Sequence, residues 1–267
     1  MVPLGFLVVQ AFWTQTESGV DRTLTLANFE QLFSEDGEHY WRLLARTLIV
    51  SIIATSTVLL LAYPAAYFLA FGSVLSKGLW LILLVIPSWI SYLLRIFSWK
   101  VMLGFGGIIN SGLKSLGLID APIEWLLYNP VAVTITLAHS WSAFAVLPIY
   151  VSLQKMDHSV LEASADLGDS AIKRFGRVTL PLSMPGVLAA TVLVFVPVMG
   201  DYITPQLVGG TSGVMIGTAI ASLFNKEGNA PLGAALSLVM MLAVCAVLAA
   251  AWASLRSAGL WRPRVSA

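Results

Sequence analysis

The sequence contains little charge and almost no cysteine. Charged residues make up 11% of the 267 residues, whereas a soluble domain carries about 25%. The single cysteine, Cys245, cannot form a disulfide within the chain. It lies inside an apolar stretch, which favours a small packed side chain over a reactive thiol. The low charge argues against an ordinary soluble domain.

Motifs for nucleotide binding and catalysis are also absent. No G-x-x-x-x-G-K-[ST] sequence occurs, so the chain does not bind ATP through a P-loop. The glycine-rich run 209–213 is not followed by lysine and is typical of a tight turn. There is no G-x-S-x-G or H-E-x-x-H motif and no basic patch with interleaved aromatic residues. We therefore predict no metal site, no cofactor bound by this chain and no nucleic-acid partner.

Apolar sequence, by contrast, occurs in long runs. Hydrophobic residues make up 58% of the chain, and the mean hydropathy is +0.84. A helix needs roughly 20 residues to cross the hydrocarbon core of a bilayer. A soluble globule of this length cannot bury five such helices, so we predict an all-α integral membrane protein. The runs without Asp, Glu, Lys or Arg are 47–71, 79–94, 129–154, 178–200 and 228–255.

The first residues form a shorter apolar stretch, Pro3–Trp13. It lacks the basic start and the cleavage site of a signal peptide. We interpret it as the end of a truncated first membrane helix, with Met1 an internal start or the true chain beginning earlier. The chain 1–267 is then one transmembrane domain with six spans: 1–13, 43–72, 78–102, 129–153, 184–204 and 232–255.

The distribution of charge predicts the orientation. Loop 14–41 holds six acidic residues and one base, whereas the 154–177 segment and the charged tail 256–267 are rich in Lys and Arg. Loops rich in Lys and Arg lie in the cytoplasm. Both termini are therefore expected inside, with loops 73–78 and 154–183 inside and loops 14–41, 103–128 and 205–231 outside.

Two arginines run against this pattern. Arg42 and Arg46 lie near the outer end of the predicted 43–72 span. Long cationic side chains can reach the interface with their charged ends. We expect these two to do so, or to pair with acids of loop 14–41.

The most informative motif lies between the fourth and fifth predicted spans. It reads Glu162-Ala163-Ser164, three residues, Gly168, nine residues, then Val178, Thr179 and Leu180-Pro181. This is similar to the EAA loop of permease subunits of binding-protein-dependent ABC importers, with the pattern E-A-A, three residues, G, nine residues, I, one residue, L-P. Every spacing agrees, while Ser164 stands for the second Ala and Val178 for the Ile. The resemblance implies a cytoplasmic loop that docks into a cleft of an ATPase subunit.

Local rules predict that the 154–183 loop begins with a helix. Asp157 or Ser159 can accept hydrogen bonds from the first free N–H groups and so cap its start. Gly168 can adopt a positive φ without steric cost and so end the helix.

A second, shorter helix is expected after this glycine. Asp169 and Ser170 can cap it, and Asp169 lies four residues before Lys173, on the same helical face. Pro181, which has no N–H to donate, is expected to stop it.

Polar residues in or beside the spans are the candidates for a substrate pathway. Asp201 follows Pro197 and Gly200 and precedes Tyr202. Glycine and proline beside a charge are typical of a broken or terminating helix that lines a wet site. An acid beside an aromatic ring suits a cationic substrate. The alternative is an acid that only marks the outer end of the fifth span.

The third predicted span carries a second group of candidates. Trp89 and Tyr92 precede Arg95 in the 78–102 segment. A charge in this position is expensive unless it is paired or hydrated. We expect Arg95 to pair with Asp201 or with an acid of a partner.

The resemblance extends beyond the loop. Three segments look like the spermidine/putrescine branch of these permeases: 87–95, 107–110 together with 116–119, and 200–210. The likeness as a whole covers about residues 1–255. It implies the type I ABC importer fold, in the bacterial cytoplasmic membrane, and a polyamine substrate. Related branches carry iron, thiamine, phosphonates or opines, and these substrates are the alternatives.

The resemblance also implies partners. Two ATPase subunits, which bind ATP and Mg²⁺, are expected on the cytoplasmic side. A second permease, homologous or identical, completes the pathway within the lipid. A periplasmic or lipid-anchored binding protein delivers the substrate to the outer loops. No covalent chemistry is expected in this chain.

Two other classes of function remain as alternatives. An ion-coupled secondary transporter needs a relay of buried ionisable residues and no ATPase-docking loop. A membrane hydrolase needs His139 and Ser140 to face a wet cavity, although a histidine in a span more often bonds a neighbouring helix. Co-purification of an ATPase separates the importer from both.

Overall fold

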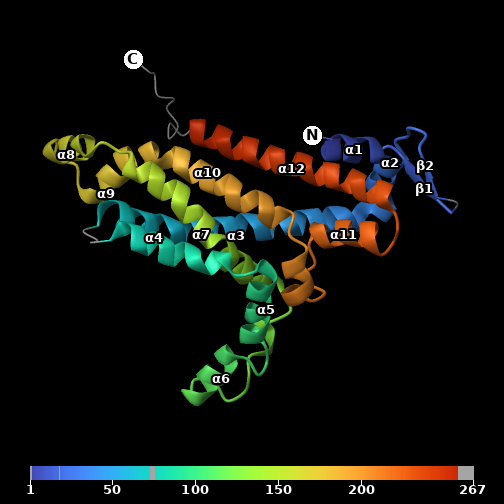
Figure 1. Cartoon of the computed structure of the whole chain (residues 1–267), viewed down its shortest axis with the longest axis horizontal. Coiled ribbons are helices and arrows are strands. Elements are labelled where there is room, and N and C mark those ends of the chain that lie inside the picture. Colours follow the sequence, from blue (N-terminus) through green and yellow to red (C-terminus); the bar gives the residue numbers. More distant parts are fainter. Residues whose placement is uncertain (1, 18, 73–75, 258–267) are drawn as a thin grey trace. The chain divides into compact units, whose positions relative to one another are not determined.

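The computed structural model describes residues 2–17, 19–72 and 76–257, and most of these are helical (Figure 1). The predicted tail 256–267 and turn 73–78 therefore lie partly outside the described residues. The chain divides into two compact units. Unit 1 contains Met1–Ile53, Leu93–Leu137 and Pro197–Ala246, and unit 2 contains Ala54–Tyr92, Ala138–Val196 and Val247–Ala267. Four long helices contribute residues to both units: α3 (Glu38–Phe71), α7 (Pro130–Gln154), α10 (Leu180–Met199) and α12 (Ala230–Ser257).

The described residues contain five helical stretches that are long and apolar enough to cross a membrane. Each overlaps one of the predicted spans. The remaining prediction, 1–13, corresponds to α1 (Val2–Gln10), which at nine residues is too short to cross a bilayer by itself. The five stretches are Glu35–Phe71, Tyr92–Ser115, Pro130–Gln154, Ala171–Met199 and Ala230–Ser257.

The predicted span at 78–102 is not one helix. α4 (Lys77–Val85) ends in a 3₁₀ turn, Ile86–Trp89, and α5 (Tyr92–Leu103) begins after two intervening residues. Pro87 explains the break, because proline lacks an N–H and its ring clashes with the carbonyl four residues earlier in a helix. The prediction of a continuous third span was therefore wrong.

The fifth predicted span, 184–204, differs at both ends. α10 begins at Leu180 and ends at Met199, and Gly200 and Asp201 leave the helix. A π-helical turn, Pro205–Gly209, follows, before α11 (Ile216–Asn225) begins. The interruption lies where glycine and proline flank the acid, as the sequence indicated.

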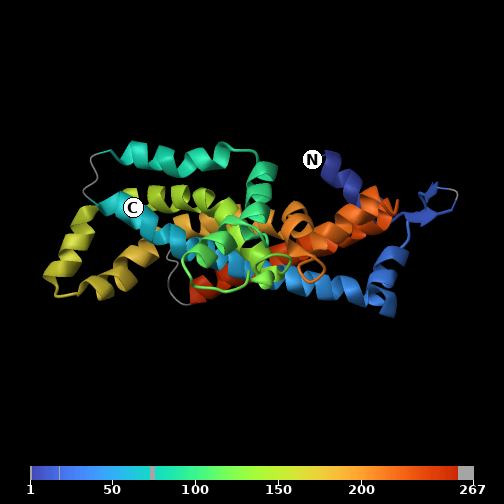
Figure 2. The same ribbon diagram turned by 90° about the horizontal axis from the view of Figure 1, so that it is seen from below.

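The start of unit 1 combines α1, a two-stranded hairpin and α2 (Ala27–Phe33). The strands β1 (Thr14–Thr16) and β2 (Gly19–Asp21) are antiparallel, and the hairpin projects beyond the neighbouring helices (Figure 2). Asn28 holds the segment together. Its buried Nδ2 donates to the carbonyls of Ala11, at 2.9 Å, and Trp13, at 2.6 Å.

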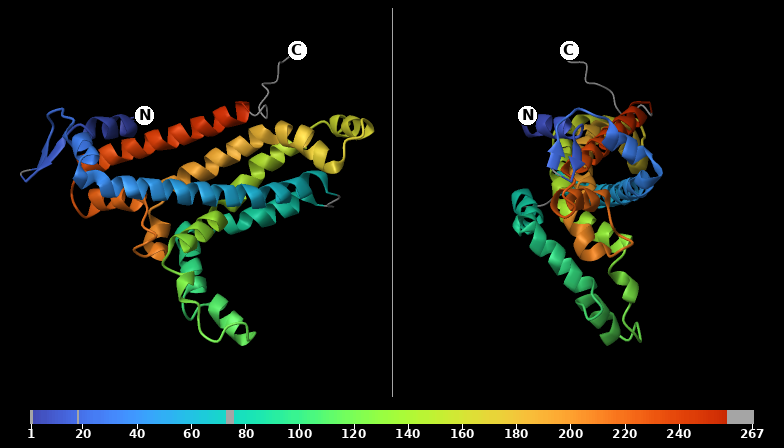
Figure 3. Two further views of the ribbon diagram at one scale, coloured as in Figure 1. Left: turned by 180° about the vertical axis from the view of Figure 1, so that it is seen from behind. Right: turned by 90° about the vertical axis from the view of Figure 1, so that its right-hand side faces the viewer.

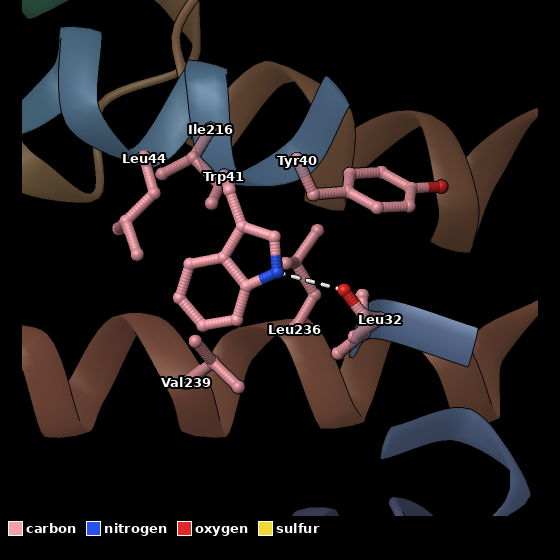
Figure 4. Close-up of a pocket in the computed structure, with 7 residues that line it drawn as sticks. All are labelled: Leu32, Tyr40, Trp41, Leu44, Ile216, Leu236 and Val239. Atoms are coloured by element: carbon pink, nitrogen blue, oxygen red, sulfur yellow. Dashed lines mark hydrogen bonds between the residues drawn. The ribbon is translucent and has the colours of Figure 1, made fainter. Parts of the chain in front are cut away.

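Trp41 fixes the start of α3 within unit 1 (Figure 4). Its indole Nε1 donates to the carbonyl of Leu32, near the end of α2, over 2.7 Å. The ring is half-buried, and the space beside it is too small to hold a water molecule. The ring lies among Tyr40, Leu44, Ile216, Leu236 and Val239.

The first turn of α11 is held from two sides. The N–H of Ile216 donates to the hydroxyl of Thr47 on α3 over 2.8 Å, and Thr47 is fully buried. On the other side, a Cβ on Gly217 would lie 2.9 Å from the carbonyl oxygen of Asp201. Only glycine allows this close approach. The start of α11 therefore packs directly against the Asp201 turn within unit 1.

The two arginines near the start of α3 behave differently. Arg42 forms an exposed ion pair with Glu38 at 3.6 Å, which confirms for this residue the predicted pairing with an acid of loop 14–41. Arg46 instead donates from Nη1 to the carbonyl of Val214 over 3.4 Å. It therefore contributes to the same α3–α11 contact as Thr47.

In unit 2, α7 and α10 approach closely at Gly186. A Cβ on this residue would lie 2.5 Å from the carbonyl oxygen of Pro148 and from the Cβ of Ser152. α10 is also joined to α3, because the hydroxyls of Tyr63 and Ser183 share a hydrogen bond of 2.8 Å. These contacts hold together the helices that carry the loop of α8 (His158–Asp166) and α9 (Ala171–Arg174), shown in Figure 1.

We expect Gly186→Ala to destabilise the protein, because the added methyl overlaps the α7 backbone. Overpacking of this kind typically costs about 1–3 kcal/mol. Thermal unfolding in detergent should show a lower midpoint. Gly112→Ala is the matched control, since a Cβ there meets no atom within 4 Å; equal midpoints for the two variants would contradict the close α7–α10 contact.

Candidate functional site

The loop between α7 and α10 carries two short helices, and these lie beyond the last turn of α7 (Figure 3). The Oδ1 atom of Asp157 accepts from the N–H of Ser159 over 2.9 Å and caps α8. This confirms the predicted cap. The backbone hydrogen bond lowers the pKa of Asp157 from its ordinary value of 3.8, so the cap is ionised at neutral pH.

Gly168 ends α8 in the predicted way. Its φ is +84°, and a Cβ there would meet no atom within 4 Å. Its N–H donates to the Ala165 carbonyl at 2.9 Å, and the N–H of Asp169 donates to the Ser164 carbonyl at 3.1 Å. This pair of bonds is the Schellman arrangement. The glycine is therefore required by backbone conformation and not by crowding.

Three polar side chains connect α8 to the segment that leads into α10. The hydroxyl of Ser164, which is 7% exposed, donates to Oδ2 of Asp169 over 3.1 Å. Nη1 of Arg177 donates to Oδ1 of the same carboxylate over 3.2 Å. The ion pair of Asp169 is thus made with Arg177, eight residues on, and not along α9 with Lys173. We call Ser164, Asp169 and Arg177 the loop clasp.

The second helix does not stop at Pro181. Ser170 caps α9, as predicted, but α9 continues through a π-helical turn, Phe175–Thr179, directly into α10. Pro181 is the second residue of α10, directly after the π-helical turn, and this wider turn accommodates a residue without an N–H. The prediction that Pro181 ends the helix was therefore wrong. Leu180 and Pro181 are both half-buried.

Other residues of the loop present an exposed surface. Glu162 and Ala163 are exposed, and Leu167 and Ile172 are 87% and 85% exposed. Large apolar side chains exposed among charged residues are typical of a protein-docking surface. Beside α8 is an open cavity of about 270 Å³, lined by Tyr67, Phe71, His158, Leu161, Glu162, Ala165 and Arg174.

Two charged groups in this cavity remain available to a partner. Among the described residues, the side chains of Glu162 and Arg174 have no hydrogen bond or ion pair, either with each other or with other groups. The described residues also contain no group of three or more His, Cys, Asp or Glu that could hold a metal ion. The loop can bind a protein through charge and apolar contact.

Asp201 caps a helix start in unit 1. Its Oδ1 accepts from the N–H groups of Ile203, at 2.9 Å, and Thr204, at 3.3 Å, and the Thr204 hydroxyl donates to Oδ2. The residue is 8% exposed. A buried carboxylate is tolerable when it accepts several hydrogen bonds of this kind. The carboxylate therefore has a clear structural role at the predicted helix break.

The other pathway candidates differ in exposure. Tyr202 is 44% exposed and Arg95, on α5, is half-buried, both in unit 1. In unit 2, Trp89 is 85% exposed, and the Tyr92 ring lies 5.9 Å from that of Trp141. The pairing of Arg95 with Asp201 stays a prediction.

Sequence reasoning did not predict that Tyr128 joins two loops of unit 1. Its φ is +65°, a rare conformation for tyrosine. The N–H of Tyr128 donates to the Val208 carbonyl at 2.9 Å. A Cβ added to Gly210 would lie 2.8 Å from the Cβ of Tyr128. No local pattern marks the residue, because its partners lie far along the chain.

His139 and Ser140 do not present a catalytic pair. His139 is exposed on α7, whereas Ser140 is 2% exposed. Adjacent residues of a helix point about 100° apart. The two side chains therefore face different surroundings.

Comparison with known proteins agrees with this arrangement. The family described as "binding-protein-dependent transport system inner membrane component" matches residues 60–260. The chain is 35% identical over 256 residues to the spermidine/putrescine transport system permease protein PotB of Escherichia coli K12, covering 96% of this chain and 92% of that protein. It is 38% identical over 215 residues to the protein of the same name from Haemophilus influenzae, covering 80% and 74%.

Solved structures show the same fold. A bacterial alginate ABC transporter, in complex with an alginate-bound periplasmic protein, matches with a TM-score of 0.68 at 18% identity, covering 96% of this chain and 87% of that one. A second structure of a bacterial alginate importer gives a TM-score of 0.62 at 16% identity, covering 94% and 89%. Relatives of the permease type are membrane transport subunits and not enzymes. The chain belongs to the inner-membrane permease components of binding-protein-dependent ABC importers.

Proposed function

We propose that this permease imports a polyamine of the spermidine/putrescine class. Support for this substrate comes from two relatives named spermidine/putrescine transport system permease protein, which are 35% and 38% identical to most of this chain. The structure of the loop of α8 and α9 is the observation that supports coupling of this permease to an ATPase subunit. Its helices are fixed by their own caps, while Glu162 and Arg174 are left without partners among the described residues.

We place this loop on the cytoplasmic side, where it docks on an ATPase subunit. The basic residues Lys155, Lys173, Arg174 and Arg177 support this orientation. Two such ATPases would bind ATP and Mg²⁺. A second permease would complete the pathway, and a binding protein would meet the loops on the opposite side.

ATP-driven closure of the ATPases would displace α8. Exposed Leu167 and Ile172 would anchor the loop in the ATPase cleft by apolar burial, and Glu162 would add a charge-assisted bond. Because α9 continues into α10 without a break, a displacement of the loop is passed directly to a membrane helix. The differential affinity of the ATPases for two loop positions would shift the permease between two states.

Within the pathway, Asp201 would attract the cationic substrate. Coulomb attraction in a partly dry cavity is several-fold stronger than in bulk water. Tyr202, next to it, is exposed enough to contact a substrate. Arg95, Trp89 and Tyr92 are further candidates for the pathway lining.

Replacement of Gly168 tests the coupling loop. We expect Gly168→Val to abolish most transport while leaving membrane insertion intact, because a β-branched residue cannot hold φ of +84° without strain. Gly168→Asn is the matched control, since asparagine tolerates this conformation. Uptake and substrate-stimulated ATP hydrolysis in membranes measure the effect. Near-normal uptake with valine would contradict the coupling role.

Replacement of Glu162 tests docking. We expect Glu162→Gln to reduce co-purification of the ATPase more than it reduces capture of the binding protein, because it removes one charged partner of a cross-subunit bond. Asp166→Asn, at the end of the same helix, serves as control. A pull-down from solubilised membranes gives both yields. Equal loss of the two partners would indicate misfolding instead.

Replacement of Asp201 tests the pathway. Asparagine caps helices about as well as aspartate, so Asp201→Asn should retain the helix start while removing the charge. We expect polyamine uptake to fall with assembly and basal ATP hydrolysis unchanged, whereas Glu30→Gln, an exposed acid of α2, should have no effect. Normal polyamine uptake by Asp201→Asn would limit the residue to its capping role. Transport of an anion by the unmodified complex would remove the polyamine assignment.

A further inference from the structure

We propose that Asp169 is a positioning residue for coupling, a role that rests on the ATPase docking proposed above. Asp169 is joined to Ser164 twice, through its backbone N–H and through its carboxylate. The same carboxylate binds Arg177, within the π-helical turn that leads into α10. One side chain therefore links the end of the docking helix α8 to the base of a membrane helix.

The other end of α8 is also attached. The ring of His158, its first residue, lies 5.7 Å from that of Phe71 at an interplanar angle of 83°. Phe175, in the π-helical turn, lies 5.5 Å from Tyr63 and 6.3 Å from Tyr67. These aromatic contacts tie the first residue of α8 and the π-helical turn to the end of α3, whereas the last turn of α8 needs a connection of its own.

The loop clasp supplies that connection. A displaced helix passes its motion on only if its attachments do not deform under the applied force. With the clasp intact, α8 and the start of α10 move together. Without it, the segment 167–170 can bend and absorb the displacement, and ATP is hydrolysed without import.

The bond made by the Ser164 side chain depends on a departure from the E-A-A pattern. Ser164 occupies the position where the E-A-A pattern has alanine, which has no hydroxyl to donate. Its side chain is nearly fully buried against Asp169, whereas the Arg177 side chain is 70% exposed. The serine and the aspartate therefore act as one unit, and the arginine adds an exposed, salt-sensitive bond.

The test compares import with ATP hydrolysis. The complete transporter, with its ATPases, second permease and binding protein, is reconstituted in proteoliposomes, and radiolabelled spermidine imported per ATP hydrolysed is measured. We expect Asp169→Asn to lower this ratio about threefold, the effect of losing one partly exposed charged bond. Arg177→Gln should lower it similarly, and the double variant should be no worse than either single one. Ser164→Ala should have a smaller effect.

Asp166→Asn is the matched control, because Asp166 lies in the same helix and has no partner among the described residues. Its ratio should equal that of the unmodified transporter. An unchanged ratio in Asp169→Asn, or additive losses in the double variant, would overturn the proposal. The proposal would also be overturned if Asp169→Asn lowered thermal stability, or the amount of ATPase subunit that co-purifies, while spermidine import per ATP hydrolysed stayed unchanged. That result would indicate a merely structural role. Failure of the unmodified permease to hold an ATPase would instead refute the proposed function, before any variant is compared.

Discussion

Backbone N–H and C=O groups must be hydrogen-bonded wherever water is excluded, and this requirement determines where the membrane helices can end. At the start of α11 the buried hydroxyl of Thr47 accepts from Ile216. At the break after α10 the carboxylate of Asp201 accepts from Ile203 and Thr204. In both places a side chain supplies the acceptor that the preceding turn of a helix would have supplied. At these two helix starts, polar side chains of the apolar segments therefore satisfy the backbone.

The loop of α8 and α9 satisfies the same requirement by local means. Asp157, Gly168 and Ser170 provide its caps, and all three lie within a few residues of the groups that they serve. The hydrogen bonds that cap its two helices therefore come from within the loop. The hydrogen bond between Tyr63 and Ser183 then joins α10, into which the loop leads, to α3. A self-contained element on a firmly joined base is suited to transmit a displacement.

This difference explains which features could be predicted from the sequence. The caps of the loop and the turn at Gly168 were predictable because their causes are local. The hydrophobic runs predicted an all-helical membrane protein, and the five long apolar helices agree with it. Local rules failed at Pro87, where a long apolar run suggested one span, and at Pro181, where a π-helical turn accommodates the proline. Local rules also did not predict the hydrogen bonds of Thr47 and Tyr128, because their partners Ile216 and Val208 lie far along the chain.

The π-helical turn at Phe175–Thr179 has a consequence for how this loop can vary. Each residue of an α-helix rotates the chain by about 100°, and a π turn holds one residue more than an α turn. The residue count between Gly168 and Pro181 therefore sets the rotational phase of α8 relative to α10. Inserting one residue would turn the Glu162 face away by about 100°, whereas substituting a residue would leave it in place. In this chain the spacing of the E-A-A pattern is unchanged, although Ser164 stands where the pattern has alanine.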